Sequence, residues 1–296
     1  MSRLDASGLF YTDLFAREKG LTGLVLVSDP SAHHTLMDGM DRLVLAVYEE
    51  LADKRDTEHW MWGGTRILVR RLTKDALEDE IRHGEITGII QWLAGGEVLL
   101  DQDGDLERMR ESIRMWPASI KERKLLCEFS CFAKTYSLTK RYLQDGSVMD
   151  AYGHVLLCLQ HWANLVLIEE RKGPEPDVWQ HVKRINPGVY KLYEELTANE
   201  ETEEQRVRLA MLACEFSLLT KMKSSCILLL RLLGSRSDGW SAADLMHHPE
   251  LSGLPIDLEL LLFKLVKRGY AREVVKSVRE PVSGLCEIRY TAERVG

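Results

Sequence analysis

The hydrophobic period of this 296-residue sequence changes twice, and the changes divide the chain into three parts. Residues 1–117 alternate short apolar runs with helical spacing, residues 118–223 keep a helical period, and residues 224–296 end in two strand-like runs after three short helices. Hydrophobic residues make up 45% of the chain, which is enough for each part to have a core. We therefore predict a multidomain α+β protein with these boundaries.

The first part has the pattern of an α/β domain. The runs at residues 24–27 and 43–47 are rich in Leu and Val and are bounded by turn residues, which is typical of strands buried on both faces. The remainder predicts a strand, two helices, a short extended piece and a further helix, at residues 66–72, 73–84, 86–93, 98–100 and 106–115.

Polar residues gather between the first two strands. Ser28 directly follows the first strand, and Asp38 and Asp41 come just before the second. Carboxylates at positions i and i+2 of a strand point to the same side and can share a divalent metal. Asp38 and Asp41 are three residues apart, so they would need a bulge to converge.

This order of strand, small-residue turn, Asp and strand resembles the nucleotidyltransferase superfamily. The resemblance implies that Ser28 contacts the phosphates of a nucleotide and that Asp41, with Asp38, binds Mg²⁺ as the catalytic carboxylates. The chain departs from the motif: Val27 stands at the usual glycine, and Arg70 and Arg71 stand where a third acid is expected. The incomplete carboxylate set favours ligand binding over transfer and leaves enzyme activity open.

Two longer segments extend the resemblance. Residues 84–101 are similar to the helix, glycine and short strand that close small nucleotidyltransferase domains. Residues 150–196 are similar to the helical second domain of a nucleotidyltransferase-like protein family of Gram-positive bacteria, which also ends in a winged helix. The resemblance implies an all-helical bundle domain at 118–223 and a cleft between the first two domains that binds a nucleotide or phosphorylated small molecule.

The last part, residues 224–296, has the layout of a winged helix-turn-helix domain, three helices followed by a hairpin. Residues 226–296 carry a net charge of +1, against −8 for the rest of the chain. Acidic Asp257 and Glu259 at the start of the third helix oppose contact with phosphates. We therefore leave open DNA binding and protein contact, including a homodimer. The basic residues expected to contact DNA are Lys264, Lys267, Arg268, Arg272 and Lys276.

One helical face in the middle part carries residue types that can bind metals: Asp150, His154, Cys158 and His161. The strongly apolar helix around them favours a packing role instead. Six cysteines without a C-x-x-C pair, a polar N-terminus and apolar runs shorter than a membrane span predict a cytoplasmic protein with no membrane partner.

Overall fold

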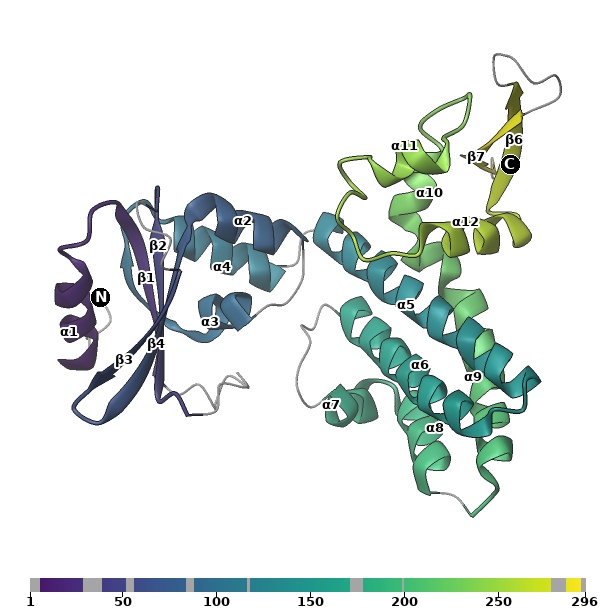
Figure 1. Cartoon of the computed structure of the whole chain (residues 1–296), viewed down its shortest axis with the longest axis horizontal. Coiled ribbons are helices and arrows are strands. Elements are labelled where there is room, and N and C mark those ends of the chain that lie inside the picture. The colour runs from purple at the N-terminus through teal and green to yellow at the C-terminus, as the bar shows by residue number, and fades with distance from the viewer. Residues whose placement is uncertain are drawn as a thin grey trace. The chain divides into compact units, whose positions relative to one another are not determined.

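The computed structural model forms two compact units, residues 1–120 and 121–296, and each is described by itself (Figure 1). The residues that the structure describes are 6–28, 39–51, 56–83, 88–115, 118–170, 178–198, 200–277 and 286–293. The first predicted boundary, at residue 117, lies close to the division between the units. The second predicted boundary, at residues 223 and 224, falls inside the second unit and stays a prediction.

The first unit is built on a five-stranded sheet in the order β3-β4-β2-β1-β5. β1 is antiparallel to β2 and to β5, whereas β2 and β4 are parallel. The sequence predicted every strand except β3, an edge strand whose mixed, largely exposed side chains lack the Leu and Val pattern. The strands are β1 (Leu21–Val27), β2 (Arg42–Tyr48), β3 (Thr57–Trp62), β4 (Thr65–Thr73) and β5 (Glu97–Asp101).

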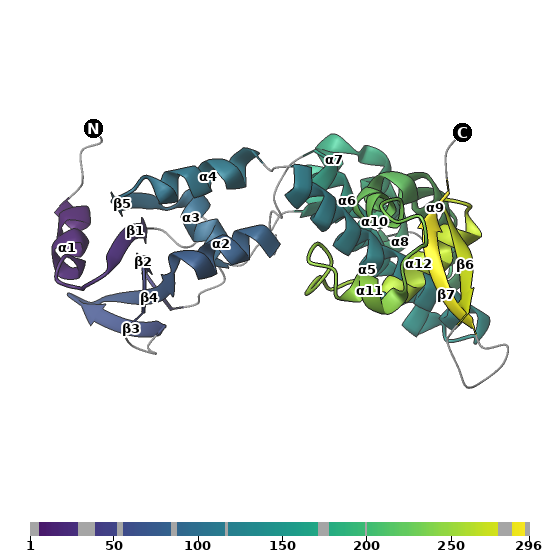
Figure 2. The ribbon, with the colours of Figure 1, turned by 90° about the horizontal axis from the view of Figure 1, so that it is seen from above.

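Helices cover both faces of this sheet. Helix α1 lies on one face, and α2, α3 and α4 gather on the other (Figures 1 and 2). Alternate residues of β1 and β2 therefore enter two separate cores, which explains why these strands are apolar throughout. The helices are α1 (Ala6–Phe15), α2 (Lys74–His83), α3 (Gly88–Gly95) and α4 (Asp105–Met115).

The turn between α3 and β5 needs a glycine at position 96. A Cβ atom there would lie 2.5 Å from Val25 Cγ1 and 2.6 Å from the carbonyl oxygen of Trp92. The carboxylate of Asp101 at the end of β5 accepts hydrogen bonds from the amides of Leu106 and Glu107, at 3.2 and 3.0 Å, and so caps α4. Gly96 and Asp101, the glycine and the terminal Asp of the segment that resembles the family, therefore each have a structural role.

The second unit begins with five helices, as the sequence predicted. Helix α6 contacts α7, α8 and α9, and one side of it is fully buried. Among the described helices it alone is long and apolar enough to cross a membrane, but these contacts are those of a core helix. The helices are α5 (Ala118–Gln144), α6 (Val148–Glu169), α7 (Val178–Ile185), α8 (Pro187–Ala198) and α9 (Glu203–Ser225).

The rest of the second unit contains three short helices followed by a hairpin. Ser241 caps α11 by accepting a hydrogen bond from the amide of Asp244, and Asp257 caps α12 through the amide of Leu260. A single bridge between Trp240 and Tyr290 pairs the residue before α11 with the hairpin. The elements are α10 (Ile227–Leu233), α11 (Ala242–Met246), α12 (Leu258–Lys267), β6 (Ala271–Ser277) and β7 (Cys286–Ala292).

Candidate functional site

The structure brings Ser28 and Asp41 to the same edge of the sheet. Val27 at the end of β1 pairs with Leu43 near the start of β2, so residues just outside these strands meet at one edge. Both Ser28 and Asp41 are exposed there. The antiparallel pairing of β1 and β2 is therefore what assembles this part of the predicted site.

Asp41 has a structural role at this edge. Its amide donates to the carbonyl oxygen of Arg66 at 2.9 Å, and its Oδ2 accepts the amide hydrogen of Arg66 at 2.7 Å. The two bonds fasten the start of β2 to the start of β4. One carboxylate oxygen is therefore already used, whereas Oδ1 accepts no hydrogen bond from the residues that the structure describes.

The described residues do not complete a metal site around Asp41. The next carboxylate along this side of the described sheet is Glu97 on β5, two strands away from β2, or about 10 Å at the usual strand spacing. No group of three His, Cys, Asp or Glu side chains within the described ranges could hold a metal ion. Asp38 lies outside the described residues, so its pairing with Asp41 stays a prediction.

Arg66 is a charged residue at this edge that the sequence interpretation missed. Strand alternation places its side chain on the same face of the sheet as that of Asp41, the face covered by α2, α3 and α4. A Cβ atom at Gly39 would lie 3.4 Å from Nη1 of Arg66, so the guanidinium is next to the backbone just before β2. The signal in the sequence was a basic residue opening a strand after the Gly63 and Gly64 turn.

Arg71 belongs to a partly buried network away from this edge. It forms ion pairs with Glu18 at 3.1 Å and Glu58 at 2.5 Å, and its guanidinium lies 5.5 Å from the ring centroid of Trp60. Tyr48 donates a hydrogen bond to Glu18. Burial alone would raise the pKa of Glu18, but hydrogen bonds from Arg71 and Tyr48 and the charge of Arg71 outweigh it and lower that pKa.

Arg70 lies beside Arg71 but contacts a different partner. Its Nη1 donates to the Thr57 hydroxyl at 2.8 Å, at an exposed position. The register places Arg70 opposite Leu45 and Arg71 opposite Ala46, which is four and five residues along β2 from Asp41, or about 13 to 16 Å. These arginines therefore do not occupy an acid's place beside Asp41; they hold the sheet together at its far end.

The metal-type residues of α6 do not converge. His161 Nδ1 lies 2.7 Å from Glu128 Oε1 on α5, and that oxygen also accepts a hydrogen bond from Asn164 at 2.8 Å. His154 bonds to its own helix backbone, and Cys158 is fully buried. This geometry supports the packing role that the apolar helix indicated.

The five basic residues expected to contact DNA lie in two environments. Lys264, Lys267 and Arg268 line a cavity together with residues of α5 and α9. Arg272 is exposed on β6, and Lys276 forms an ion pair of 3.6 Å with Asp238. Of these three lining residues, Lys264 is partly buried, whereas Lys267 and Arg268 are exposed.

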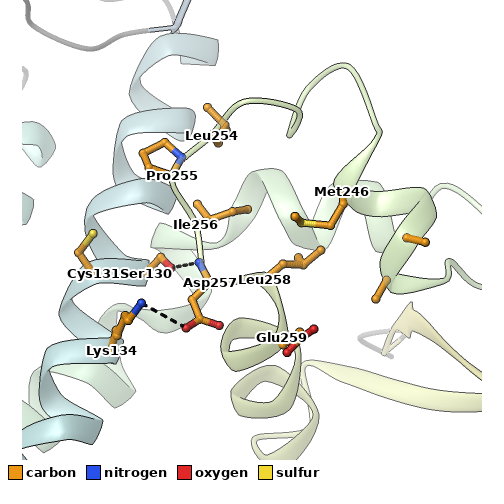
Figure 3. A pocket seen from close by; sticks show the side chains of 12 residues that line it. Ser130, Cys131, Lys134, Met246, Leu254, Pro255, Ile256, Asp257, Leu258 and Glu259 are labelled. Atoms are coloured by element: carbon orange, nitrogen blue, oxygen red, sulfur yellow. Dashed lines mark hydrogen bonds and ion pairs between the residues drawn. The ribbon is translucent and has the colours of Figure 1, made fainter.

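A larger cavity, of about 780 Å³, lies between α5 and the segment around α11 and α12 (Figure 3). Its polar groups bond to one another: Ser130 Oγ accepts the amide hydrogen of Asp257 at 2.7 Å, and Lys134 Nζ lies 3.9 Å from the Asp257 carboxylate. Most of the other lining side chains, including Met246 and Ile256, are apolar. This cavity therefore lies where α5 packs against the segment around α11 and α12.

The sheet order, the meeting of Ser28 and Asp41 at one edge and the flanking helices define a nucleotidyltransferase-like domain. Residues 10–123 match the family described as Nucleotidyltransferase-like, and residues 122–221 match the family described as YgxA-like substrate binding domain. The second match spans α5 to α9.

Two known proteins resemble nearly the whole chain. The Uncharacterized protein YgxA of Bacillus subtilis (strain 168) is 24% identical over 246 residues, which are 83% of each chain. The crystal structure of a nucleotidyltransferase-like protein from Exiguobacterium sibiricum 255-15 superposes with a TM-score of 0.82 at 23% identity, covering 96% of this chain and 97% of the other. Over residues 10–221 the chain thus resembles the nucleotidyltransferase-like protein family that is found in Gram-positive bacteria.

Proposed function

We propose that the chain binds a nucleotide or another phosphorylated small molecule at the sheet edge formed by Ser28, Asp41 and Arg66. The family match to a substrate binding domain supports a small-molecule ligand. The edge offers a hydroxyl, a second carboxylate oxygen of Asp41 and an exposed guanidinium, at the ends of three adjacent strands. Arginine is well suited to phosphate because its planar donors can contact two phosphate oxygens together.

The proposal is for binding and not for nucleotidyl transfer. Transfer of this kind needs metal ions held by several carboxylates that neutralise the charge developing on the phosphates. Asp41 supplies one carboxylate, and the hydrogen bond from Arg66 to its Oδ2 is the observation that carries this conclusion. A weakly held Mg²⁺ between Asp38, Asp41 and the ligand phosphates remains a prediction, as does the placement of the ligand in a cleft between the first two domains.

Calorimetric titration with ATP, GTP, CTP and UTP in the presence of Mg²⁺ tests the proposal. Asp41→Asn is the sharpest variant because the amide oxygen can still accept the hydrogen bond from Arg66 while the charge is lost. We expect at least one nucleotide to bind to the wild type, and we expect Asp41→Asn to lower the affinity for that nucleotide by about tenfold. Asp101→Asn, at the opposite edge of the sheet, is the matched control and should bind as the wild type does.

The proposal fails if none of the four nucleotides binds. It also fails if Asp41→Asn and Asp101→Asn have the same affinity as the wild type. Arg66→Gln provides a second test of the same edge, since loss of the guanidinium should weaken binding of the phosphates without touching the carboxylate.

We also propose that residues 224–296 form a winged helix-turn-helix, as an alternative basis for a non-enzymatic regulatory role. Three helices followed by an antiparallel hairpin, with Trp240 paired to Tyr290, support this interpretation. Binding of the full chain to random duplex DNA across a salt series tests the DNA role, with Arg272→Gln as the variant. A doubled mass in light scattering would instead favour the homodimer.

A further inference from the structure

A cavity of about 380 Å³ in the second unit has an unusual charge. It lies between α5, α9 and α12, and all of its lining residues belong to the second unit. Five of its lining residues are basic and one is acidic. The basic residues are Lys140 and Arg141 from α5 and Lys264, Lys267 and Arg268 from the end of α12; the acid is Glu215 from α9.

These five cations differ from their neighbours in having no ion-pair partner among the residues that the structure describes. The other basic side chains of the C-terminal part mostly have one. Arg231 pairs with Glu122 and Glu250, and Arg289 pairs with Asp238 and Glu287. Unpaired cations drawn from two facing helices repel one another, so they are suited to an anionic ligand that lies between them.

Lys264 shows the effect of this crowding. Burial is the largest effect that lowers the pKa of Lys264, and the positive charges of Lys140 and Lys267 lower that pKa further. Its Nζ lies 5.6 Å from the ring centroid of Tyr136, on the wall of the cavity. Glu215, the acid among the lining residues, offsets little of the repulsion between the cations, because its carboxylate already accepts a hydrogen bond from the Tyr136 hydroxyl.

We propose that this cavity binds a compact anion that carries two or more phosphate groups. A volume of about 380 Å³ is in the range of small-molecule sites. Lys264 is partly buried in the cavity, and the other four cations are exposed around it, where they can close on the phosphates of a small ligand. The exposed ring of Phe263, at 63% accessibility, lies at the rim and offers a stacking face for a group attached to the phosphates. The site is distinct from the sheet edge of the first unit and does not depend on it.

Calorimetric titration of the full chain with inorganic tripolyphosphate, without Mg²⁺, tests this proposal. Loss of one charge-assisted contact should weaken binding by about tenfold or more in Lys264→Gln and in Arg268→Gln. Lys264→Gln removes a buried, repelled charge, so it should fold at least as well as the wild type. Arg272→Gln is the matched control because it removes an exposed cation of the same part that does not line the cavity.

Three results would overturn the proposal. The first is that tripolyphosphate does not bind to the wild type. The second is that Arg272→Gln weakens binding as much as Lys264→Gln, which would indicate general attraction to positive charge. The third is that a DNA duplex binds more tightly than tripolyphosphate and that Lys264→Gln and Arg268→Gln weaken DNA binding to the same extent. A loss of tripolyphosphate binding in Lys264→Gln and Arg268→Gln, whose residues both belong to the second unit, separates this site from the one proposed for the first unit.

Discussion

Replacement of Arg71 by Met should lower the free energy that is needed to open the sheet of the first unit. The side chain of Arg71 is 11% exposed, and those of its partners Glu18 and Glu58 are 34% and 22% exposed. Removing one member of a fully buried ion pair costs about 3–5 kcal/mol, whereas exposed pairs contribute about 0.2–1 kcal/mol. For this intermediate exposure we expect Arg71→Met to reduce the free energy of opening by about 2–3 kcal/mol, since the ion pairs of Arg71 with Glu18 and Glu58 are both lost.

Hydrogen exchange of the full chain, followed by mass spectrometry of peptides from β3 and β4, measures this opening directly. A loss of 2–3 kcal/mol corresponds to exchange that is about 30- to 150-fold faster. Arg70→Met is the matched control. Among the described residues this neighbouring arginine bonds to the exposed Thr57 hydroxyl, so its loss should change exchange by less than about fivefold. Equal effects of the two variants would refute the role given to the network.

The pH dependence gives a second test of the same network. The pKa of Glu18 is lower in the folded chain than its usual value of 4.5, so the stabilisation is present above that value and is lost as the pH falls through the folded pKa. The difference in exchange between wild type and Arg71→Met should therefore be large at pH 7 and shrink below about pH 4. A difference that persists unchanged in acid would mean that Glu18 does not carry it.

Three further substitutions test the packing. Gly96→Ala should lower the free energy of unfolding by about 1–3 kcal/mol, since its Cβ would lie 2.5 Å from Val25 Cγ1; an unchanged melting temperature would contradict this. Lys124→Met should raise it by about 1–3 kcal/mol at pH 7, because burial lowers the Lys124 pKa to about 8, and the gain should fade between pH 8 and 10.5 in urea titrations. Ser130→Ala should cost about 1–2 kcal/mol by denaturant unfolding, because it leaves the Asp257 amide without its acceptor; no change would show that water replaces the hydroxyl.

The sequence predicted most elements of the fold, but it missed helix α1 even though Tyr11 and Phe15 of that helix are buried. The strands β1 and β2 and the helices α5, α6 and α9 are all long or strongly apolar, so their periods were clear. β3 was missed because an edge strand buries little and needs no regular pattern. The Gly63-Gly64 pair that joins β3 to β4 is a local hairpin signal, but the run before it lacks the Leu and Val pattern from which β1 and β2 were predicted.

The candidate site was predicted less completely, for a physical reason. Ser28 and Asp41 could be found because they flank recognisable strands. The contribution of Arg66 depends on the parallel pairing of β2 with β4, which is a contact between segments distant in sequence. Arg71 was taken to replace a third acid, whereas the register places it about 16 Å from Asp41 in an ion-pair network with Glu18.

The proposed binding of a phosphorylated ligand at the sheet edge can be tested most directly by hydrogen exchange with and without nucleotide and Mg²⁺. The account predicts that peptides covering the end of β1 and the starts of β2 and β4, around Ser28, Asp41 and Arg66, exchange more slowly when the ligand is bound, and that Asp41→Asn diminishes this protection. Exchange at these peptides that stays the same with every nucleotide, or protection confined to the second unit, would contradict the central claim.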